Sequence, residues 1–336
     1  MVEPENLNSR KTDHIQLAFE AQATNLDDRF NYEPMLNAHP VAGCIPPLQL
    51  AGKTLKAPLW ISSMTGGAQL AGTINRNLAL ACREFGLGMG LGSCRPLLGS
   101  DESLPDFAIR KHIGDQPLFA NLGIAQIEEM LALGKVKQIS TLVERLEADG
   151  LIVHVNPLQE WLQPEGDRIA MSPLDTITHL LDEVGFPVMV KEVGQGFGPK
   201  SMEALSALPL EAIEFAAQGG TNFALLENLR SDAFHQDMYE PVTHIGHSPH
   251  EMVKMATALC NRSENVIKTR AYIVSGGVRN FLDGYYYLRG IPWKTMYAQA
   301  SAFLKYAMLG EKEVMEFTAA QIKGLELAYT FLTLKK

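Results

Sequence analysis

The sequence is poor in the features that mark disulfide-rich, zinc-ribbon and membrane proteins. Its 336 residues include only four cysteines, Cys44, Cys82, Cys94 and Cys260. No two of them form a C-x-x-C pair, which argues against a zinc ribbon or a redox dithiol. The longest apolar runs, such as residues 150–155, are far too short to cross a bilayer. No apolar segment follows Met1, so we expect no signal peptide and a location in the reducing cytoplasm.

Positive charge is also scarce. The chain has 29 Lys and Arg against 38 Asp and Glu, a net charge of -9. A protein that binds nucleic acid or a membrane surface would show a basic face, so we expect neither partner. An anionic small molecule remains compatible with this balance, because a few local Arg and Lys side chains hold a phosphate even on an acidic protein.

Several common catalytic and binding motifs are missing. No nucleophile elbow, P-loop or G-x-G-x-x-G stands between a strand and a helix. A histidine-rich stretch within residues 222–250 has neither a nearby cysteine nor an H-E-x-x-H frame, so we interpret it as a long loop that forms a substrate lid and not as a zinc site. Its histidines are His235, His244, His247 and His250.

What the chain does contain is a repeated alternation of short apolar runs and longer amphipathic segments. Strands that are apolar on both faces, each followed by a helix, predict a parallel sheet covered by helices. Eight repeats favour a closed (β/α)8 TIM barrel over an open doubly wound sheet. The expected strands are 57–64, 86–92, 117–123, 150–156, 187–194, 212–217, 272–276 and 295–300, and the expected helices include 71–84, 136–149, 173–184, 201–207 and 249–259.

No Gly/Ser-rich linker or composition shift divides the chain. We therefore expect residues 1–336 to form one barrel domain preceded by a polar arm of about residues 1–56. Within the arm, a helix is expected over residues 13–22 and a proline-punctuated loop over residues 33–47.

Polar residues and glycines gather where seven of the eight expected strands end. In a (β/α)8 barrel these ends share one face, and the active site lies on that face. The clusters are residues 62–67, 92–95, 121–123, 154–156, 191–192, 219–221 and 275–279.

The segment Ser275-Gly276-Gly277-Val278-Arg279 follows an expected strand and precedes an expected helix. Adjacent glycines let the backbone approach an anion, and the helix N-terminus after them presents free amides. Arg279 would add a charge-assisted contact. We interpret the segment as a phosphate site; the alternative is a tight turn with a solvent-facing arginine.

Lys191 and the loop after residue 154 are further candidates. A lysine at the end of an apolar strand needs a partner, so Lys191 forms a Schiff base, pairs with a carboxylate such as Glu192, or stabilises negative charge on a cofactor. His154 and Asn156 share one side of their strand, and Glu160 is placed to bind Mg²⁺. The alternative for this loop is that Asn side chains cap it.

Taken together, these motifs resemble type 2 isopentenyl-diphosphate isomerase. The resemblance runs in order through Arg10-Lys11-Thr12-Asp13-His14-Ile15, Met64-Thr65-Gly66-Gly67, Gly92-Ser93-x-Arg95, Asn121-Leu122-Gly123, residues 154–168, residues 190–194 and Gly219-Gly220-Thr221. It covers most of the chain. The arm motif and the 156–168 block are specific to that family, whereas the Ser-Gly-Gly-x-Arg turn is shared with many FMN barrels.

The resemblance implies a homo-oligomeric enzyme, a tetramer or octamer, that interconverts isopentenyl and dimethylallyl diphosphate with FMN, Mg²⁺ and NADPH as the flavin reductant. The flavin would then act as an acid/base and not as a hydride carrier. The implied catalytic residues are His154, Gln159 and Lys191. The implied FMN residues are Ser63, Met64, Thr65, Ser93, Asn121, Lys191, Thr221, Gly276, Gly277, Val278, Arg279, Ala300 and Ser301. The implied substrate residues are Arg10, Lys11, Arg95, His154, Asn156 and Gln159, with Glu160 on the metal.

The chain departs from the family pattern at residues 222–228, where the usual aromatic-containing stretch is replaced, and in its last strand, which lacks a glycine often found beside the flavin phosphate. Two other functions share the fold. An FMN-dependent dehydrogenase or oxidase would place a His–Arg acid/base pair near the second-last strand, and a non-catalytic flavin-binding subunit would not need Lys191, Gln159 and Glu160.

Overall fold

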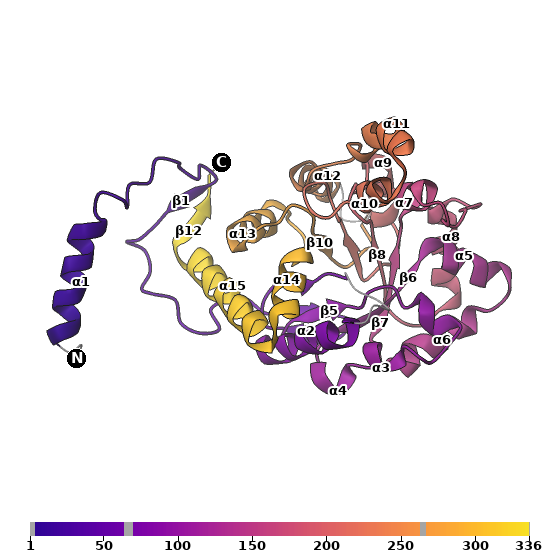
Figure 1. The fold of residues 1–336 in the computed structure, drawn as a ribbon, viewed down its shortest axis with the longest axis horizontal. Coiled ribbons are helices and arrows are strands. Elements are labelled where there is room, and N and C mark those ends of the chain that lie inside the picture. Colours follow the sequence, from indigo (N-terminus) through magenta and orange to yellow (C-terminus); the bar gives the residue numbers. More distant parts are fainter. Residues whose placement is uncertain (1–3, 64–69, 263–266, 336) are drawn as a thin grey trace.

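A computed structural model describes residues 4–63, 70–262 and 267–335. Its centre is a closed barrel of eight parallel strands surrounded by helices (Figure 1), which confirms the expected (β/α)8 fold. The strand order around the barrel is β10-β11-β4-β5-β6-β7-β8-β9. All eight expected strands are present, each within its expected range. Their bounds are β4 (Leu59–Ile61), β5 (Gly88–Gly90), β6 (Leu118–Gly123), β7 (Gly150–His154), β8 (Val188–Lys191), β9 (Ala212–Glu214), β10 (Tyr272–Val274) and β11 (Thr295–Gln299).

Alternation along these buried strands sorts the side chains into two apolar clusters. The inner cluster fills the barrel and includes Trp60, Phe119 and Met189, with the rings of Trp60 and Phe119 edge to face at 5.9 Å. The outer cluster lies between the strands and the surrounding helices and includes Leu118 and Val190. Because neighbouring residues of one strand point to opposite faces, continuous apolar runs supply both clusters.

The surrounding helices follow the expected alternation with shifts of a few residues. In α2, Ile74, Leu78 and Cys82 are buried at helical spacing, and Gly86 ends the helix with a φ of 67°. The described helices include none that is long and apolar enough to span a membrane. The larger barrel helices are α2 (Ala71–Phe85), α5 (Ile124–Ala132), α6 (Val136–Arg145), α7 (Pro157–Leu162), α8 (Pro173–Glu183), α9 (Pro199–Ser206), α12 (Pro249–Arg262), α13 (Phe281–Gly290), α14 (Ser301–Leu309) and α15 (Glu311–Phe331); shorter turns are the 3-10 helix Arg95–Leu98, α3 (Leu104–Phe107) and α4 (Arg110–Ile113).

A hairpin that the sequence did not predict closes the bottom of the barrel. Strands β2 (Leu48–Leu50) and β3 (Lys53–Leu55) pair antiparallel. Their buried Leu50 and Leu55 join the inner apolar cluster. The amide of Ala51 also donates to Glu211 Oε1 at 2.6 Å. With this end plugged, the carboxyl ends of the strands are left as the open face.

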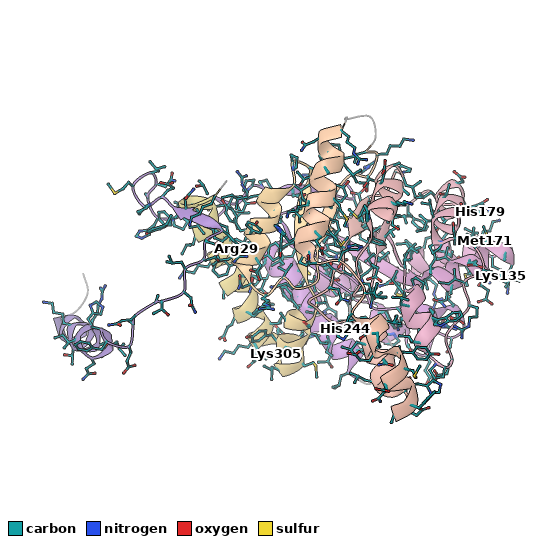
Figure 2. All side chains as sticks on the ribbon, turned by 90° about the horizontal axis from the view of Figure 1, so that it is seen from above. Arg29, Lys135, Met171, His179, His244 and Lys305 are labelled. Atoms are coloured by element: carbon teal, nitrogen blue, oxygen red, sulfur yellow. The ribbon has the colours of Figure 1, made fainter. Side chains whose placement is uncertain are left out.

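The arm begins with α1 (Pro4–Leu17), which lies well apart from the barrel (Figure 1). The expected helix over residues 13–22 was therefore placed too late in the chain. Every side chain from residue 10 to residue 17 is exposed, so no buried face marks where this helix begins or ends. Further along, β1 (Phe30–Tyr32) pairs antiparallel with β12 (Leu332–Leu334). Arg29, just before β1, bonds Asp283 Oδ1 at 2.7 Å and ties the arm to α13 (Figure 2).

The expected long loop over residues 222–250 is largely helical, so that interpretation of its local structure was wrong. It contains α10 (Phe223–Arg230) and α11 (Ala233–Thr243). Asn222 and Asp232 cap these helices by accepting bonds from Leu225 and His235 amides. Among the described residues no group of three or more His, Cys, Asp or Glu side chains is placed to hold a metal ion. His244 pairs with Glu240 on the surface of this segment (Figure 2).

Candidate active site

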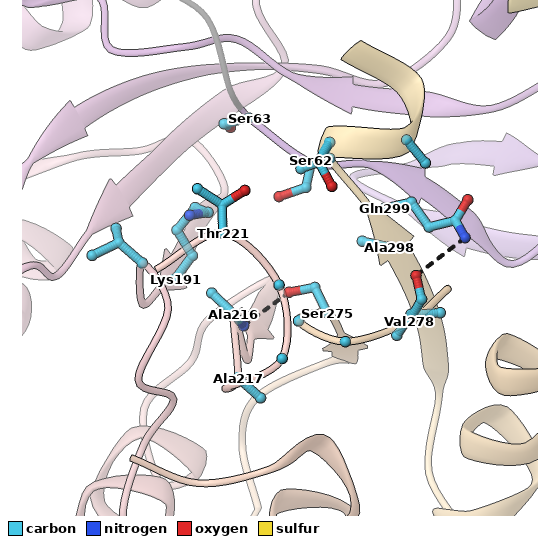
Figure 3. A pocket seen from close by; sticks show the side chains of 18 of the residues that line it. Ser62, Ser63, Lys191, Ala216, Ala217, Thr221, Ser275, Val278, Ala298 and Gln299 are labelled. Carbon is cyan, nitrogen blue, oxygen red and sulfur yellow. Dashed lines mark hydrogen bonds between the residues drawn. The ribbon is translucent and has the colours of Figure 1, made fainter. Parts of the chain in front are cut away.

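A cavity of about 470 Å³ opens at the carboxyl ends of β4 and β8–β11. Figure 3 shows Lys191 on one side of this cavity and Gln299 on the other. The residues predicted from sequence that line it are Ser63, Lys191, Thr221, Gly276, Gly277, Val278, Arg279, Ala300 and Ser301. Ser93 and Asn121 are not among its lining residues, and Met64 and Thr65 lie outside the described residues.

Four glycines, Gly219, Gly220, Gly276 and Gly277, form one end of this cavity. Gly276 and Gly277 have φ values of 86° and 69°, in the left-handed region. A Cβ on Gly276 would lie 2.0 Å from the carbonyl oxygen of Ala217, and one on Gly220 would lie 3.3 Å from Gly276 Cα. Only glycine fits at Gly276, and a side chain at Gly220 would push the turn after β9 against the turn after β10. The arrangement leaves their backbones exposed to a ligand in the cavity.

The source of free helix amides differs from the expectation. The N-terminus of α13, which follows the glycine turn, is occupied: Asn280 accepts from the amides of Leu282 and Asp283. Asp283 Oδ2 in turn accepts from the Arg279 amide at 3.0 Å. The uncapped terminus is that of α14, where Ala300 makes no side-chain cap and Ser301 and Ala302 line the cavity. The sequence-based prediction assigned the free amides to the helix after Arg279 and missed that Asn280, a typical N-cap residue, would occupy them.

Lys191 lies at the floor of the cavity with only 5% of its surface exposed. Its Nζ donates to the carbonyl of Glu192 at 2.8 Å. The Glu192 carboxylate points away and accepts from the amides of residues 194, 195 and 196 at 2.6, 2.6 and 2.9 Å. Burial raises the pKa of Glu192, and these amides oppose the shift. The alternative of a Lys191–Glu192 side-chain pair is therefore not realised.

Glu214 is a second buried charge beside the cavity, and sequence reasoning missed it. It lies opposite Lys191 in the register of β8 and β9, is 1% exposed, and accepts a bond from the Ser62 hydroxyl. Its other oxygen, Oε2, has no hydrogen-bond donor among the described residues. Glu214 is an acidic residue within the apolar run of residues 212–217. Lys191 was selected from the sequence for the same reason, a charged residue in an apolar strand, so this signal could have identified Glu214 as well.

A polar cluster follows β6 and β7. The Asn121 amide donates to the Leu91 carbonyl at 3.0 Å, and its Oδ1 lies 2.7 Å from His154 Nδ1. This places the proton on Nδ1 and leaves Nε2 of a neutral imidazole as an acceptor. Burial and the nearby Lys191 ammonium lower the pKa of His154 to about 3.

The first turn of α7 extends this cluster. Asn156 Nδ2 donates to Gln159 Oε1 at 3.1 Å and to Glu160 Oε1 at 2.9 Å. Its side chain makes no cap to the helix backbone, so the alternative of a merely capped loop does not describe it. Gln159 Nε2 lies 3.4 Å from Oε1 of Glu227, a buried residue of α10 that sequence reasoning also missed.

Arg95 and Glu160 are linked through Asp167. Arg95 bonds the Asp167 carboxylate at 2.7 and 3.4 Å, and Gln126 donates to the same group at 2.7 Å. The Asp167 amide donates to Glu160 Oε2 at 2.7 Å. Arg95, Asn156, Gln159 and Glu160 are thus brought into one network. Arg10 and Lys11 are not, because they lie on α1 away from the barrel (Figure 1).

Comparison with known proteins identifies relatives along nearly the whole chain. The chain is 33% identical over 333 residues to the isopentenyl-diphosphate delta-isomerase of Cronobacter sakazakii, covering 96% of this chain and 92% of that one. It is 36% identical over 286 residues to the Nostoc protein of the same name, covering 82% and 78%. No family model matches the chain.

Among solved structures, flavocytochrome b2 with sulfite bound gives a TM-score of 0.61 at 14% identity, covering 89% of this chain and 70% of that one. A mandelate oxidase mutant with an FMN adduct gives 0.56 at 11% identity, covering 92% and 88%. At these identities the similarity shows the barrel fold.

His154 makes stability depend on pH. An imidazole of ordinary pKa, near 6.5 in the unfolded chain, binds its proton at higher pH than His154 does when folded. Stability is therefore lost as the pH falls from 6.5 toward 3. Between pH 7.5 and 5.5 we expect the wild type to lose about 1 kcal/mol more than His154→Gln, measured by urea unfolding. Equal losses in the two proteins would contradict a neutral, partly buried imidazole.

Proposed function

Because the chain belongs to the isopentenyl-diphosphate delta-isomerase family, we propose that it interconverts isopentenyl and dimethylallyl diphosphate as a type 2, FMN-dependent enzyme. The observation that carries the proposal is a pair of adjoining sites on one barrel face. One is the glycine-ended cavity floored by Lys191, and the other is the polar network around Asn156 and Glu160.

FMN fits the first site. Its volume of about 470 Å³ lies within the range of small-ligand pockets, about 300–1,000 Å³. The turns around Gly220 and Gly276, the uncapped α14 terminus and Arg279 suit the phosphate, as the loops after the last two strands do in many barrels. Ser63 and Lys191 at the far end suit the ring. When bound and reduced by NADPH, the flavin supplies an electron-rich surface and an acid/base nitrogen.

Lys191 contributes charge at the ring end of this cavity. Within the described part of the chain no carboxylate forms an ion pair with its ammonium. Its charge is therefore left to stabilise negative charge that a reduced cofactor brings into the cavity, at low dielectric. Glu214, which pairs with Lys191 on the adjacent strand β9, accepts a hydrogen bond from the hydroxyl of Ser62 after β4. This bond links the Lys191 side of the cavity to the side formed by β4.

The polar network suits the diphosphate. Arg95 and Gln159 supply hydrogen-bond donors, and Asn156 holds Gln159 and Glu160 in place through its own amide. Glu160 contributes one buried carboxylate with lone pairs to spare after accepting two bonds. Mg²⁺ typically uses one or two protein carboxylates together with waters and substrate phosphates. The residues present therefore fit a cation held between Glu160 and the substrate. Binding the diphosphate here holds the reacting carbons over the adjoining cavity.

The competing dehydrogenase or oxidase reading has less support. Such enzymes would need a histidine base beside the flavin near the second-last strand. Among the described residues that line the flavin cavity there is no histidine. Of the candidates, His244 pairs with Glu240 and His250 stacks on Tyr286.

The test is anaerobic incubation of the purified protein with isopentenyl diphosphate, Mg²⁺, FMN and dithionite. We expect dimethylallyl diphosphate to form and no net oxidation of the flavin. In a parallel incubation, NADPH and an added electron acceptor replace dithionite; if no dimethylallyl diphosphate forms in either incubation while NADPH is consumed in the second, the oxidoreductase function is correct instead.

Glu160→Gln keeps the side-chain shape and the bond to Asn156 in one amide orientation, but removes the charge. We expect the Mg²⁺ concentration needed for half-maximal activity to rise at least tenfold, because the protein no longer supplies a charged ligand and only waters and the substrate phosphates remain. Glu165→Gln, an exposed carboxylate nearby in the chain, is the control. An unchanged Mg²⁺ dependence in Glu160→Gln would exclude the assigned role.

We also propose that the protein is a homo-oligomer in which the arm of one subunit serves the site of another. Arg10 and Lys11 carry the diphosphate-binding motif of the family, yet α1 lies apart from its own barrel (Figure 1). Their cationic side chains complement the diphosphate region at the mouth of a neighbouring barrel.

Mixing two defective variants tests this arrangement. Arg10→Ala/Lys11→Ala has an intact barrel, and Lys191→Met has an intact arm. After the subunits are exchanged, we expect activity to reappear, since some hybrid sites combine both intact parts. Activity that stays at the level of the separate variants would mean that each arm serves its own barrel.

A further inference from the structure

Glu214 brings a second buried charge to the mouth of the barrel. It is 1% exposed, and it lies opposite Lys191 in the register of β9 and β8. Strand alternation puts both side chains on the inner face, because Met189 and Ala212, two residues earlier on each strand, belong to the inner apolar cluster. One carboxylate and one ammonium therefore enter the barrel interior side by side.

Within the described residues these two groups form no direct ion pair. Lys191 Nζ donates to the Glu192 carbonyl at 2.8 Å. Glu214 Oε1 accepts from the Ser62 hydroxyl, and Glu214 Oε2 has no hydrogen-bond donor in the part of the chain that the structure describes. Buried carboxylates are normally paired or fully hydrogen-bonded. A carboxylate left partly open one strand away from an ammonium acts through space, and the low dielectric of the barrel interior strengthens that effect.

The backbone after Glu214 holds this strand end in place. The Phe215 amide donates to the Ile273 carbonyl of β10 at 3.0 Å. Ala216 adopts a φ of 43°, in the left-handed region that residues other than glycine rarely occupy, and its amide donates to Ser275 Oγ at 2.8 Å. Figure 3 shows this bond at the edge of the glycine-ended cavity. The carboxylate is thus carried by a fixed strand end, which suits a charge that acts without moving.

The glycine-ended cavity itself has an excess of positive charge. Among the described residues that line it, the charged ones are Lys191, Arg279 and Lys305, and none is a carboxylate. Glu214 lies behind this lining and reaches it through Ser62, whose hydroxyl donates to it. Its position makes it the carboxylate that offsets the lysine on the Lys191 side of the cavity.

We propose that Glu214 sets the charge balance at the flavin ring. Its carboxylate offsets the Lys191 ammonium and limits how strongly the site favours reduced, negatively charged FMN over oxidised FMN. This inference rests on the proposed binding of FMN in the cavity and adds the residue that tunes it. A flavin that serves as an acid/base must release and regain a proton, and an uncompensated ammonium beside it would hold it as the anion.

The test is the midpoint potential of bound FMN, measured anaerobically on the purified holoprotein by dithionite titration against a reference dye. Glu214→Gln removes the charge and nearly keeps the shape. We expect it to bind reduced FMN, relative to oxidised FMN, at least tenfold more favourably than the wild type does. This change is a positive shift of about 30 mV for a two-electron couple. Glu214→Asp keeps the charge and should stay close to the wild-type potential.

Two further variants separate charge from structure. Glu214→Met removes the charge and both oxygens, so it should give the same positive shift as the amide. Glu211→Gln is the matched control, because Glu211 is 5% exposed and immediately precedes β9, but accepts from the Ala51 amide at the closed end of the barrel. Its potential should equal that of the wild type, and the melting temperature of each variant without FMN checks folding.

An unchanged potential in Glu214→Gln and Glu214→Met, or an equal shift in Glu211→Gln, would overturn the inference alone. Loss of FMN binding by both neutral variants would also overturn it, because the residue would then have a structural role. Wild-type protein that binds no FMN would contradict the proposed function, and this inference with it.

Discussion

The arrangement of the whole site depends on how the chain leaves β8. Glu192 turns its carboxylate onto the amides of residues 194–196, and this clamp forces a tight loop directly after the strand. Because adjacent residues of a strand point to opposite faces, Lys191 lies on the other side of the strand from the Glu192 carboxylate. Its ammonium donates to the Glu192 carbonyl. One carboxylate thereby orients the loop that follows the strand and is not available to the neighbouring lysine.

That loop is tied to the next one. The amide of Phe223 donates to the Val193 carbonyl at 3.2 Å, and Gln195 reaches Asn222. A Cβ on Gly194 would lie 2.6 Å from Asn222 Cα, so the backbones are in contact. Thr221, beside Asn222, lines the cavity that ends in the glycine turns. The rim of the barrel is therefore a set of loops held by one another, which suits a site that must position two ligands with little reorganisation.

The sequence predicted the barrel well because its strands are buried on both faces and each ends in a polar cluster. It predicted poorly where structure is fixed by only a few residues. The β2–β3 hairpin is two three-residue strands, too short for a period to be recognised, and α1 has no buried face to mark its ends. Helices α10 and α11 were not predicted, although Asn222 and Asp232, which cap them, are residues typical of helix N-termini.

For the site, residues that stand out within an apolar strand, such as Lys191, were found from the sequence. Glu227 and Lys305 were not, because their roles come from helices that pack over the barrel face. Glu227 reaches Gln159 from α10, and Lys305 lines the same glycine-ended cavity as Lys191 from the second turn of α14. Which helix residues point into a site depends on how the helix packs, and the sequence pattern does not specify this.

The pairing of β1 with β12 limits how far the N-terminal arm can reach. Residues 18–29 in extended form span at most about 40 Å, and the 14 residues of α1 add about 21 Å. The C-terminal strand fixes the base of this tether. Arg10 and Lys11 are thus confined to a sphere of a few tens of ångströms, where their effective concentration is on the order of millimolar. The pairing of β1 with β12 thereby limits how far the arm proposed to bind the diphosphate can reach.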